Sequence, residues 1–315
     1  MFKILEKHTL APKVDMMVIH APYIAKHAKT GNFVILRLNE KGERIPLTIA
    51  DSDGKSGTIT ILYQKVGKTT EALGLLKPGN KIRDVVGPLG HEMQIKTYGR
   101  CILVAGRMGA AKLYPILKPL KETNPLTSTT KENEINPPLP PFSKGRMGGL
   151  SVEMNNHVTV IMGARTKELL IWEDKFRQFA DECLITTDDG TYGRKGLVTD
   201  VLKEVIEAKS AAIIIAVGPI RMMKAVSDLT KPYGIKTIVS LNSLMVEGTG
   251  MCGACRVRIS GETKFACIDG PEFDGHEVDF QELERRLTFY KEEEEQAYKL
   301  FLNKGFKGPR DQGFK

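Results

Sequence analysis

The sequence Glu247-Gly-Thr-Gly-Met-Cys252-Gly-Ala-Cys255 places two thiols three positions apart on a glycine-rich loop. A third thiol, Cys267, follows a short predicted hairpin over residues 256–265. Thiolates on tight loops at such spacings are typical ligands of iron–sulfur clusters, and the plant-type pattern has another cysteine where Glu247 stands. Because a carboxylate oxygen is a plausible fourth ligand, the pattern predicts a [2Fe–2S] site held by Glu247, Cys252, Cys255 and Cys267.

Two other interpretations of these cysteines stay open at this point. Zinc also takes sulfur and oxygen ligands at this spacing, so a zinc knuckle is an alternative. A disulfide between Cys252 and Cys255 is less favoured, because nothing else in the sequence indicates an oxidising compartment. The other two cysteines, Cys101 and Cys183, lie in apolar runs and are interpreted as inert core thiols.

The composition indicates a globular protein of two or three domains, since the chain has 315 residues and is 41% hydrophobic. The first residues lack the apolar core of a signal peptide, and no apolar run approaches the ~20 residues of a membrane-spanning helix. We therefore expect a cytoplasmic protein with no membrane partner. The net charge of +8 suits an anionic partner. Because the basic residues are dispersed and no nucleic-acid-binding motif accompanies them, we expect no nucleic-acid partner.

Residues 1–98 have the pattern of a small antiparallel β-barrel. Short β-prone runs at residues 14–20, 33–38, 44–49 and 58–63 are separated by turn residues, and one short helix spans residues 69–76.

Residues 99–240 have the alternating pattern of a doubly wound parallel sheet. Apolar strands are predicted at residues 101–105, 158–162 and 211–217, with helical segments at 167–180 and 197–208. Phosphate groups are expected at the carboxyl ends of such strands and at helix N-termini.

Residues 124–155 interrupt this second domain with a composition too poor in apolar residues for a packed core. We interpret the segment as a disordered insertion, whose proline run is either a docking ligand or a surface loop without function. Residues 241–290 form the predicted cluster domain. A charged helix over residues 282–302 and a basic tail follow, so that residues 291–315 make a helix-and-tail segment.

Residues at two places in the predicted barrel are candidates for holding a dinucleotide. Arg44 offers a bidentate donor to a pyrophosphate, and Thr48 offers a hydroxyl to the edge of a planar ring. Gly67, Lys68 and Thr69 begin the short helix, where free N–H groups bind phosphate. An exposed arginine and an ordinary capped helix remain as the alternatives.

Small residues follow two strands of the predicted parallel sheet. Gly106 and Gly109 form a glycine turn that lacks the G-x-G-x-x-G fingerprint, so a plain tight turn is an equal alternative. Gly218 follows the strand at 211–217. Together these turns are candidates to line a nicotinamide dinucleotide cleft. The polar loop at residues 188–190 is a candidate ribose contact, although a surface loop is the more common occurrence.

In this order, the motifs resemble the ferredoxin-reductase superfamily. More narrowly, they are similar to the NAD-binding small subunit of NADH-dependent ferredoxin:NADP oxidoreductase, also called sulfide dehydrogenase. That group is sister to the electron-transfer subunit of dihydroorotate dehydrogenase. The resemblance covers the chain except residues 124–155 and the extreme C-terminus. It is carried by residues 44–51 (RIPLTIAD), 66–70, 87–90, 186–190, 218–223, 247–255 and 265–275.

The resemblance implies three cofactors and their residues. FAD is implied on the barrel, NAD(H) on the second domain, and a [2Fe–2S] cluster near the C-terminus. The group's non-thiolate cluster ligand is aspartate, where this chain has Glu247, and Lys112 stands where the group has proline. The residues implied for FAD are Arg44, Pro46, Leu47 and Thr48, with Gly67, Lys68 and Thr69; those for NAD(H) are Gly106, Gly109, Gly218 and Met222.

The resemblance also implies an electron-transfer function and a partner. FAD would exchange hydride with NAD(H) and single electrons with the cluster, and a large flavin- and iron–sulfur-containing subunit would reduce ferredoxin and NADP, by electron bifurcation. No acid–base residue is singled out for hydride transfer. A dihydroorotate dehydrogenase is the alternative partner, and a zinc-stabilised scaffold without enzymatic function is the alternative of another class.

Overall fold

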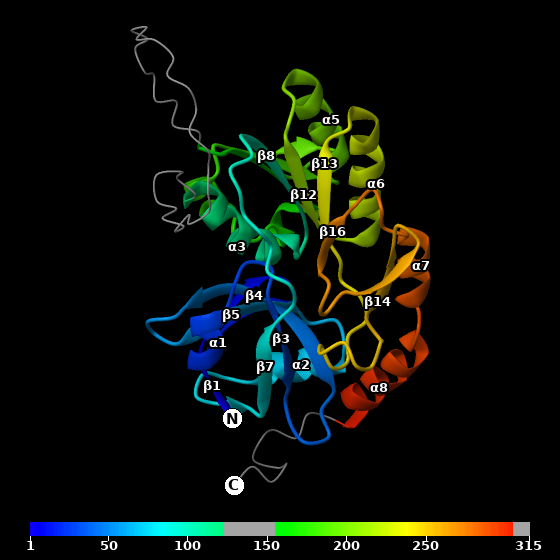
Figure 1. Cartoon of the computed structure of the whole chain (residues 1–315). Coiled ribbons are helices and arrows are strands. Elements are labelled where there is room, and N and C mark those ends of the chain that lie inside the picture. The colour runs from blue at the N-terminus through cyan, green and yellow to red at the C-terminus, as the bar shows by residue number, and fades with distance from the viewer. Residues whose placement is uncertain (123–154, 305–315) are drawn as a thin grey trace, which may run out of the picture.

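Seven antiparallel strands form the N-terminal sheet of the computed structural model, which describes residues 1–122 and 155–304 (Figure 1). The strand order is β6-β1-β2-β5-β4-β3-β7, and the sheet curls into a nearly closed barrel. Its interior is filled by buried apolar side chains such as Leu36, Ile59 and Ile61. The strands are β1 (Phe2–Ala11), β2 (Val14–His20), β3 (Phe33–Arg37), β4 (Arg44–Asp53), β5 (Thr58–Gln64), β6 (Lys81–Ile82) and β7 (Asp84–Leu89), with helices α1 (Pro22–His27) and α2 (Lys68–Leu75).

The first strand precedes the β-prone runs of the sequence. The earliest of those runs is at residues 14–20, whereas β1 spans Phe2–Ala11 and pairs with both β2 and β6. Five of its ten residues are exposed and three are only partly buried, so the strand fully buries just Ile4 and Ala11. A strand with so few buried positions has a weak period-two signal, which explains why the pattern misses it.

The second sheet is parallel except for its last strand, with order β11-β10-β9-β8-β12-β13-β16. Alternate residues of β8 face opposite layers: Ile102 packs with α5 and α6, and Leu103 packs with α3 and α4. Helices thus cover both faces, which confirms the doubly wound architecture. The elements are β8 (Arg100–Gly106), α3 (Gly109–Glu122), β9 (His157–Ala164), η1 (Lys167–Leu169), α4 (Glu173–Phe179), β10 (Glu182–Thr187), β11 (Arg194–Lys195), α5 (Val198–Ala208), β12 (Ile213–Val217), α6 (Ile220–Thr230), η2 (Lys231–Tyr233), β13 (Lys236–Ser240) and β16 (Glu272–Asp274).

The C-terminal part joins both sheets. The loop from residue 241 leads into the hairpin of β14 (Arg256–Ile259) and β15 (Glu262–Phe265), after which β16 returns to pair antiparallel with β13. Two helices follow, α7 (Phe280–Arg286) and α8 (Lys291–Lys304), and α8 runs along the outside of the barrel beside α2 (Figure 1).

Two helical segments expected as single helices are each broken. The prediction of one helix over residues 282–302 is wrong, because Tyr290, with φ of 63°, ends the run between α7 and α8. The expected helix at residues 167–180 is likewise split into η1 and α4 by Trp172, with φ of 61°. A left-handed residue turns the chain, and local sequence periodicity does not encode that turn.

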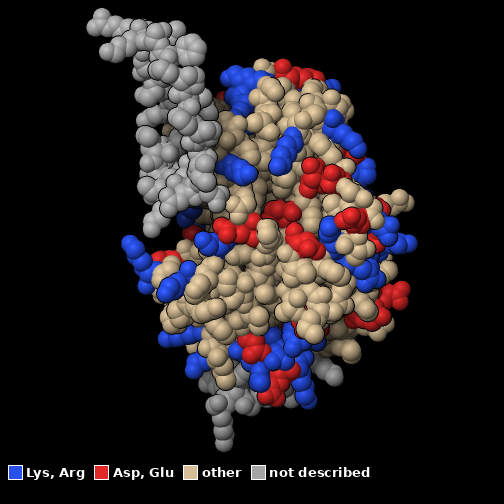
Figure 2. Space-filling view, in the orientation of Figure 1, with Lys and Arg blue, Asp and Glu red and all other residues tan. Residues whose placement is uncertain are grey.

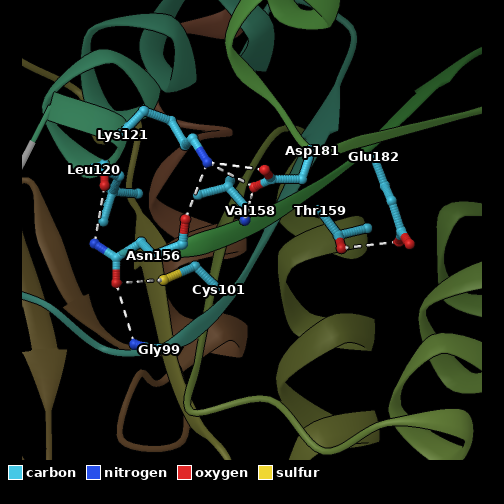
Figure 3. Close-up of polar contacts among 9 residues, drawn as sticks. All are labelled: Gly99, Cys101, Leu120, Lys121, Asn156, Val158, Thr159, Asp181 and Glu182. Atoms are coloured by element: carbon cyan, nitrogen blue, oxygen red, sulfur yellow. Dashed lines mark hydrogen bonds and ion pairs between the residues drawn. The ribbon is translucent and has the colours of Figure 1, made fainter. Parts of the chain in front are cut away.

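Asn156 anchors the return of the chain into the parallel sheet (Figure 3). Its buried side-chain oxygen accepts hydrogen bonds from the backbone N–H groups of Tyr98 and Gly99, at 2.7 and 3.1 Å. Its amide nitrogen donates to the carbonyl oxygens of Lys96 and Leu120, at 3.0 and 2.9 Å. The end of α3 and the start of β9 are therefore fixed to each other. Almost all of the expected insertion, with its proline run, and the basic tail beyond residue 304 lie outside the described residues.

The surface carries charges of both signs. On the face drawn in Figure 2, Lys and Arg side chains alternate with Asp and Glu side chains and do not form one basic stripe. Among the helices of residues 1–122 and 155–304, none combines the length and apolar character needed to cross a membrane.

Candidate functional site

A cleft of about 470 Å³ separates the barrel from the carboxyl edge of the parallel sheet. From the barrel, β4 contributes Pro46, Leu47 and Thr48. From the facing domain, the cleft is lined by residues that follow β8 and β12, among them Gly106, Gly109 and Gly218. Six residues that the sequence assigns to two different cofactors therefore line one cavity, whose size lies within the roughly 300–1,000 Å³ of small-molecule sites.

The glycines of this cleft are required by close packing. A Cβ atom on Gly109 would overlap the carbonyl oxygen of Val217, because α3 begins against the end of β12. A Cβ on Gly106 would lie 2.5 Å from the sulfur of Met222, and a Cβ on Gly218 would lie 2.7 Å from the Cε atom of the same side chain. The absence of these side chains lets the ends of two parallel strands and two helices approach each other, which is where a dinucleotide binds in such sheets.

A second cavity, of about 290 Å³, continues along the same edge of the parallel sheet. Gly106 and Met222 line it, together with Asp188 from the polar loop after β10. Three arginines also line it, at positions 107, 165 and 221, which the sequence analysis did not single out. Their positions in the sequence could have indicated an anion-binding role. Arg107 directly follows β8, Arg165 directly follows β9, and Arg221 lies in the first turn of α6, where anions bind.

The predicted phosphate donors at the start of α2 are engaged by an acidic side chain. Lys68 Nζ lies 3.0 Å from Glu43 Oε1, and the Thr69 hydroxyl donates a short hydrogen bond to the other oxygen of Glu43. Burial by itself raises the pKa of Glu43, but the hydrogen bonds from Thr69 and Lys68 hold it below its usual value. Glu43 is thus ionised at neutral pH and competes with a phosphate for the same donors.

The residues around α2 line a third cavity, of about 400 Å³, between α2 and α8. Gly67, Lys68 and Thr69 lie here and not in the cleft. Val66 and Thr70 line both cavities, so the two are adjacent. An extended ligand with its ring beside Thr48 and its phosphates beside α2 fits this pair of cavities. Arg44 is exposed at the start of β4 and lies outside the lining of both.

The cluster loop brings two of the four predicted ligands together. Cys255 Sγ and Cys267 Sγ are 3.1 Å apart, both buried, whereas Cys252 is exposed on the same loop and Glu247 is partly exposed. Burial and the neighbouring Cys255 raise the pKa of Cys267 to about 12. Within the part of the chain that the structure describes, no three His, Cys, Asp or Glu side chains converge into a preformed metal site. The four-ligand set therefore stays a prediction.

The backbone around these thiols has the form of a ligand loop. Gly248, Gly250 and Gly253 all have φ between 64° and 84°, a conformation that L side chains rarely adopt. Gly248 also rests on Ile35 of the barrel, so closely that a Cβ there would lie 2.7 Å from its Cδ1 atom. The donor chemistry of two thiols on this loop and a third directly after the hairpin fits an iron–sulfur cluster. The loop is packed directly against the barrel.

The other two cysteines are remote from this loop. Cys101 is buried in β8, where burial raises its pKa to about 12, and burial also raises the pKa of the half-buried Cys183 in β10. Cys101 is a core thiol, as the sequence indicates, whereas Cys183 is only partly buried at the edge of the core.

Comparison with known proteins identifies the region around this loop. Residues 242–279 match the family model of the iron–sulfur cluster binding domain of dihydroorotate dehydrogenase B. The chain is 44% identical over 300 residues to a dihydroorotate dehydrogenase B (NAD(+)) electron transfer subunit homolog of Thermotoga maritima, covering 95% of each chain. It is 31% identical over 284 residues to the electron transfer subunit of Desulforamulus reducens, covering 88% of this chain and 96% of that one.

Solved structures agree with this assignment. A chain of the NADH-dependent reduced ferredoxin-NADP oxidoreductase superposes with a TM-score of 0.81 at 44% identity, covering 95% of this chain and 97% of that chain. An Amycolatopsis cytochrome P450 reductase shares the fold alone, with a TM-score of 0.56 at 18% identity over 73% of this chain and 65% of that one. The chain thus belongs to the family of dihydroorotate dehydrogenase B electron transfer subunits and their homologues, which are oxidoreductase subunits with a ferredoxin-reductase-like fold.

Proposed function

We propose that this chain passes electrons between NAD(H), FAD and a [2Fe–2S] cluster, and to or from a large partner subunit that contains flavin and iron–sulfur clusters. The observation that carries the proposal is the shared cleft, in which Pro46, Leu47 and Thr48 face Gly106, Gly109 and Gly218. Bound FAD supplies the conversion between a hydride, which carries two electrons, and the single electrons that a cluster accepts.

The residues of this chain hold and orient the two dinucleotides. Leu47 and Thr48 would hold the flavin ring in the cleft, and Lys68 and Thr69 at the start of α2 would hold the FAD phosphates after release from Glu43. The glycine turns at 106 and 218 admit the nicotinamide end of NAD(H) to the same cleft. The arginines at 107 and 165 would bind its phosphates, and Asp188, which lines the same cavity, would accept a hydrogen bond from a ribose hydroxyl.

The cluster loop packs against strands β3 and β7 of the barrel. Cys252, Cys255, Cys267 and Glu247 are the proposed ligands of the cluster. Because Gly248 packs on Ile35, the loop is held at the wall of the barrel that contains the flavin site. Cys252 is exposed, so a cluster bound there lies near the surface, where a partner subunit has access to it.

The partner is proposed to be the large subunit of a bifurcating ferredoxin:NADP oxidoreductase, through which ferredoxin is reached indirectly. The 44% identical structure of that class supports this choice, as does a carboxylate at position 247 in place of a fourth cysteine. A dihydroorotate dehydrogenase is the second candidate, favoured by the names of the curated relatives. The match to an iron–sulfur family favours that cluster over zinc. We place the protein in the reducing cytoplasm, because none of its five cysteines is in a disulfide.

Anaerobic purification of the tagged chain from its own cells tests the proposal. We expect FAD, iron and acid-labile sulfide to accompany it, the flavin absorbance to bleach on addition of NADH, and a ferredoxin:NADP oxidoreductase large subunit to co-purify. Zinc without iron, or a flavin that NADH leaves oxidised, would contradict the proposal. Co-purification of a dihydroorotate dehydrogenase would select the second candidate.

A further inference from the structure

A lysine and a glutamate meet at the floor of the cleft. Lys112, in the first turn of α3, lines the cleft together with Thr48 and Ser240. Its Nζ lies 3.9 Å from Oε1 of Glu272, the first residue of β16, and the two side chains are only 13% and 9% exposed. Two ionisable side chains are rarely buried without a specific role or a structural partner, because desolvation of each charge is costly.

Glu272 stands where the three parts of the molecule meet. Its Oε1 accepts a hydrogen bond of 2.6 Å from the hydroxyl of Ser240, its register partner on β13. Its Oε2 lies against Gly31 of the barrel, where a Cβ would come within 2.8 Å of it. Glu272, on the strand that follows the cluster hairpin, thus contacts both the barrel and the parallel sheet.

The pair separates two cavities. Lys112 faces the cofactor cleft, and Glu272 lines a further cavity of about 390 Å³ on its other side. The charged and titratable residues that line this further cavity with Glu272 are His91, Glu92, Lys96, Tyr98, Lys236 and Asp274. The cofactor cleft and this polar cavity are therefore separated by the side chains of Lys112 and Glu272.

The proposed function requires a proton to leave the cleft. When NADH is oxidised by one-electron carriers, each NADH yields NAD⁺, one proton and two electrons. The cluster accepts the electrons and takes no proton, so each hydride that departs as single electrons leaves one proton behind. A buried cleft needs a side chain that accepts this proton and passes it on.

We propose that Lys112 and Glu272 form the relay that carries this proton from the cleft to the cavity lined by His91. The Lys112 ammonium passes a proton to Glu272 Oε1, breaking an N–H bond and forming an O–H bond, and the carboxylic acid releases its proton into the further cavity. The neutral amine left on Lys112 then accepts the proton that the oxidised hydride leaves in the cleft, so that an N–H bond forms again and the ion pair is restored. The gap of 3.9 Å closes with a small side-chain movement, as catalytic contacts often do when ligands bind. This inference rests on the proposed function.

Among the described residues that line the cleft, the other titratable side chains do not serve this purpose. Arg107 stays protonated at any physiological pH. Burial and the charge of Asp15 raise the pKa of Tyr63 far above its usual value. The pKa values of Lys112 and Glu272, by contrast, are shifted towards each other, which favours proton transfer between the two groups. Burial lowers the pKa of Lys112 and raises the pKa of Glu272, although the attraction between their charges opposes both shifts.

Three variants test the relay in the flavin- and cluster-loaded protein. Lys112→Met removes the proton carrier, Lys112→Arg keeps the cation without a proton that it can release, and Glu272→Gln keeps the hydrogen-bonded shape. Mixing with NADH and an electron acceptor in a weakly buffered indicator solution measures proton release beside flavin bleaching. We expect proton release to slow by about tenfold or more in each variant, with flavin bleaching by NADH changed far less. Lys118→Met, on the same helix but paired with Asp51, is the matched control and should match the wild type.

Infrared difference spectra supply a measurement independent of turnover. Between the NADH-reduced and the oxidised protein, the wild type should show a carboxylic acid band that is absent in Glu272→Gln. Proton release at the wild-type rate in folded, FAD-containing Lys112→Arg, or a band that survives in Glu272→Gln, would overturn the relay. If NADH leaves the wild-type flavin oxidised, the proposed function itself fails. If NADH reduces the wild-type flavin and the variants release protons as fast as the wild type, the relay alone fails.

Discussion

Cys255 and Cys267 hold their sulfur atoms 3.1 Å apart across the β14–β15 hairpin. Residues 256–265 are strand partners in register, with Arg256 opposite Phe265, so the hairpin brings its two flanking cysteines together. The distance between them along the chain is therefore set by the length of one hairpin, and the third thiol, Cys252, lies on the loop that enters it.

Cys267→Ser should abolish the cluster and spare the flavin. A serine hydroxyl is a poor substitute for a thiolate ligand, so iron and acid-labile sulfide should fall to background in the purified chain. FAD content should stay unchanged, because the cleft is lined by other residues. Cys183→Ser, in β10, is the control and should retain iron. Full iron content in Cys267→Ser would exclude this thiol from the ligand set.

Glu247→Cys should convert the proposed site into one with four thiolates. Because thiolate is a softer ligand than carboxylate, the visible spectrum and the reduction potential of the cluster should both change, whereas Thr249→Ser on the same loop should change neither. Redox titration followed by electron paramagnetic resonance measures the difference. Identical spectra and potentials for Glu247→Cys and the wild type would mean that residue 247 does not ligate the metal.

Glu43→Gln should tighten FAD binding. The substitution removes the negative charge that holds Lys68 and Thr69, and it frees these donors for phosphate. We expect the Kd for FAD to fall by roughly fivefold, equivalent to about 1 kcal/mol. Titration of the apoprotein by flavin fluorescence measures this. Glu40→Gln, which breaks an exposed pair with Arg83, should leave the Kd unchanged; weaker binding by Glu43→Gln would place the FAD phosphates elsewhere.

Asp181→Asn should destabilise the protein at neutral pH and not in acid. Burial by itself raises the pKa of Asp181, but hydrogen bonds from Lys121 and the backbone N–H of Val158 lower it overall (Figure 3). A carboxyl whose folded pKa is lowered contributes stability above its unfolded pKa of about 4 and loses it as the pH falls through the folded value.

Urea unfolding at two pH values measures this contribution. The free energy of unfolding of Asp181→Asn should fall by about 1 to 2 kcal/mol at pH 7, and the difference from the wild type should shrink towards pH 3. The exposed pair of Lys224 and Asp228 supplies the control, since Asp228→Asn should change little at either pH. An equal loss at both pH values would contradict the assigned cause.

Gly109→Ala should weaken both the fold and NAD(H) binding. The added methyl group overlaps the Val217 carbonyl, so α3 must shift away from β12 at the point where the cleft is formed. We expect a loss of about 1 to 3 kcal/mol in the free energy of unfolding, with a raised Kd for NADH. Gly54→Ala, whose Cβ would meet nothing closer than 3.7 Å, is the control. An unchanged Gly109→Ala variant would show that the turn has room to relax.

The sequence by itself determined the features that depend on neighbours along the chain. The spacing of Cys252 and Cys255 indicates a metal ligand loop, and alternating strands and helices after residue 99 give the doubly wound sheet. Runs such as residues 14–20 and 58–63 give barrel strands. Each of these signals is local, because turn geometry and the period of buried residues are fixed within a few residues.

Only the tertiary structure decided which of these residues meet. Thr48 and Gly109 line one cleft, and Lys68 forms an ion pair with Glu43. Lys112 forms an ion pair with Glu272, although 160 positions separate the two residues. Such contacts depend on how whole sheets pack and on where β16 returns to β13. No short stretch of sequence contains that information, because the free energy of burying a charged pair is fixed by the complete surroundings of both groups.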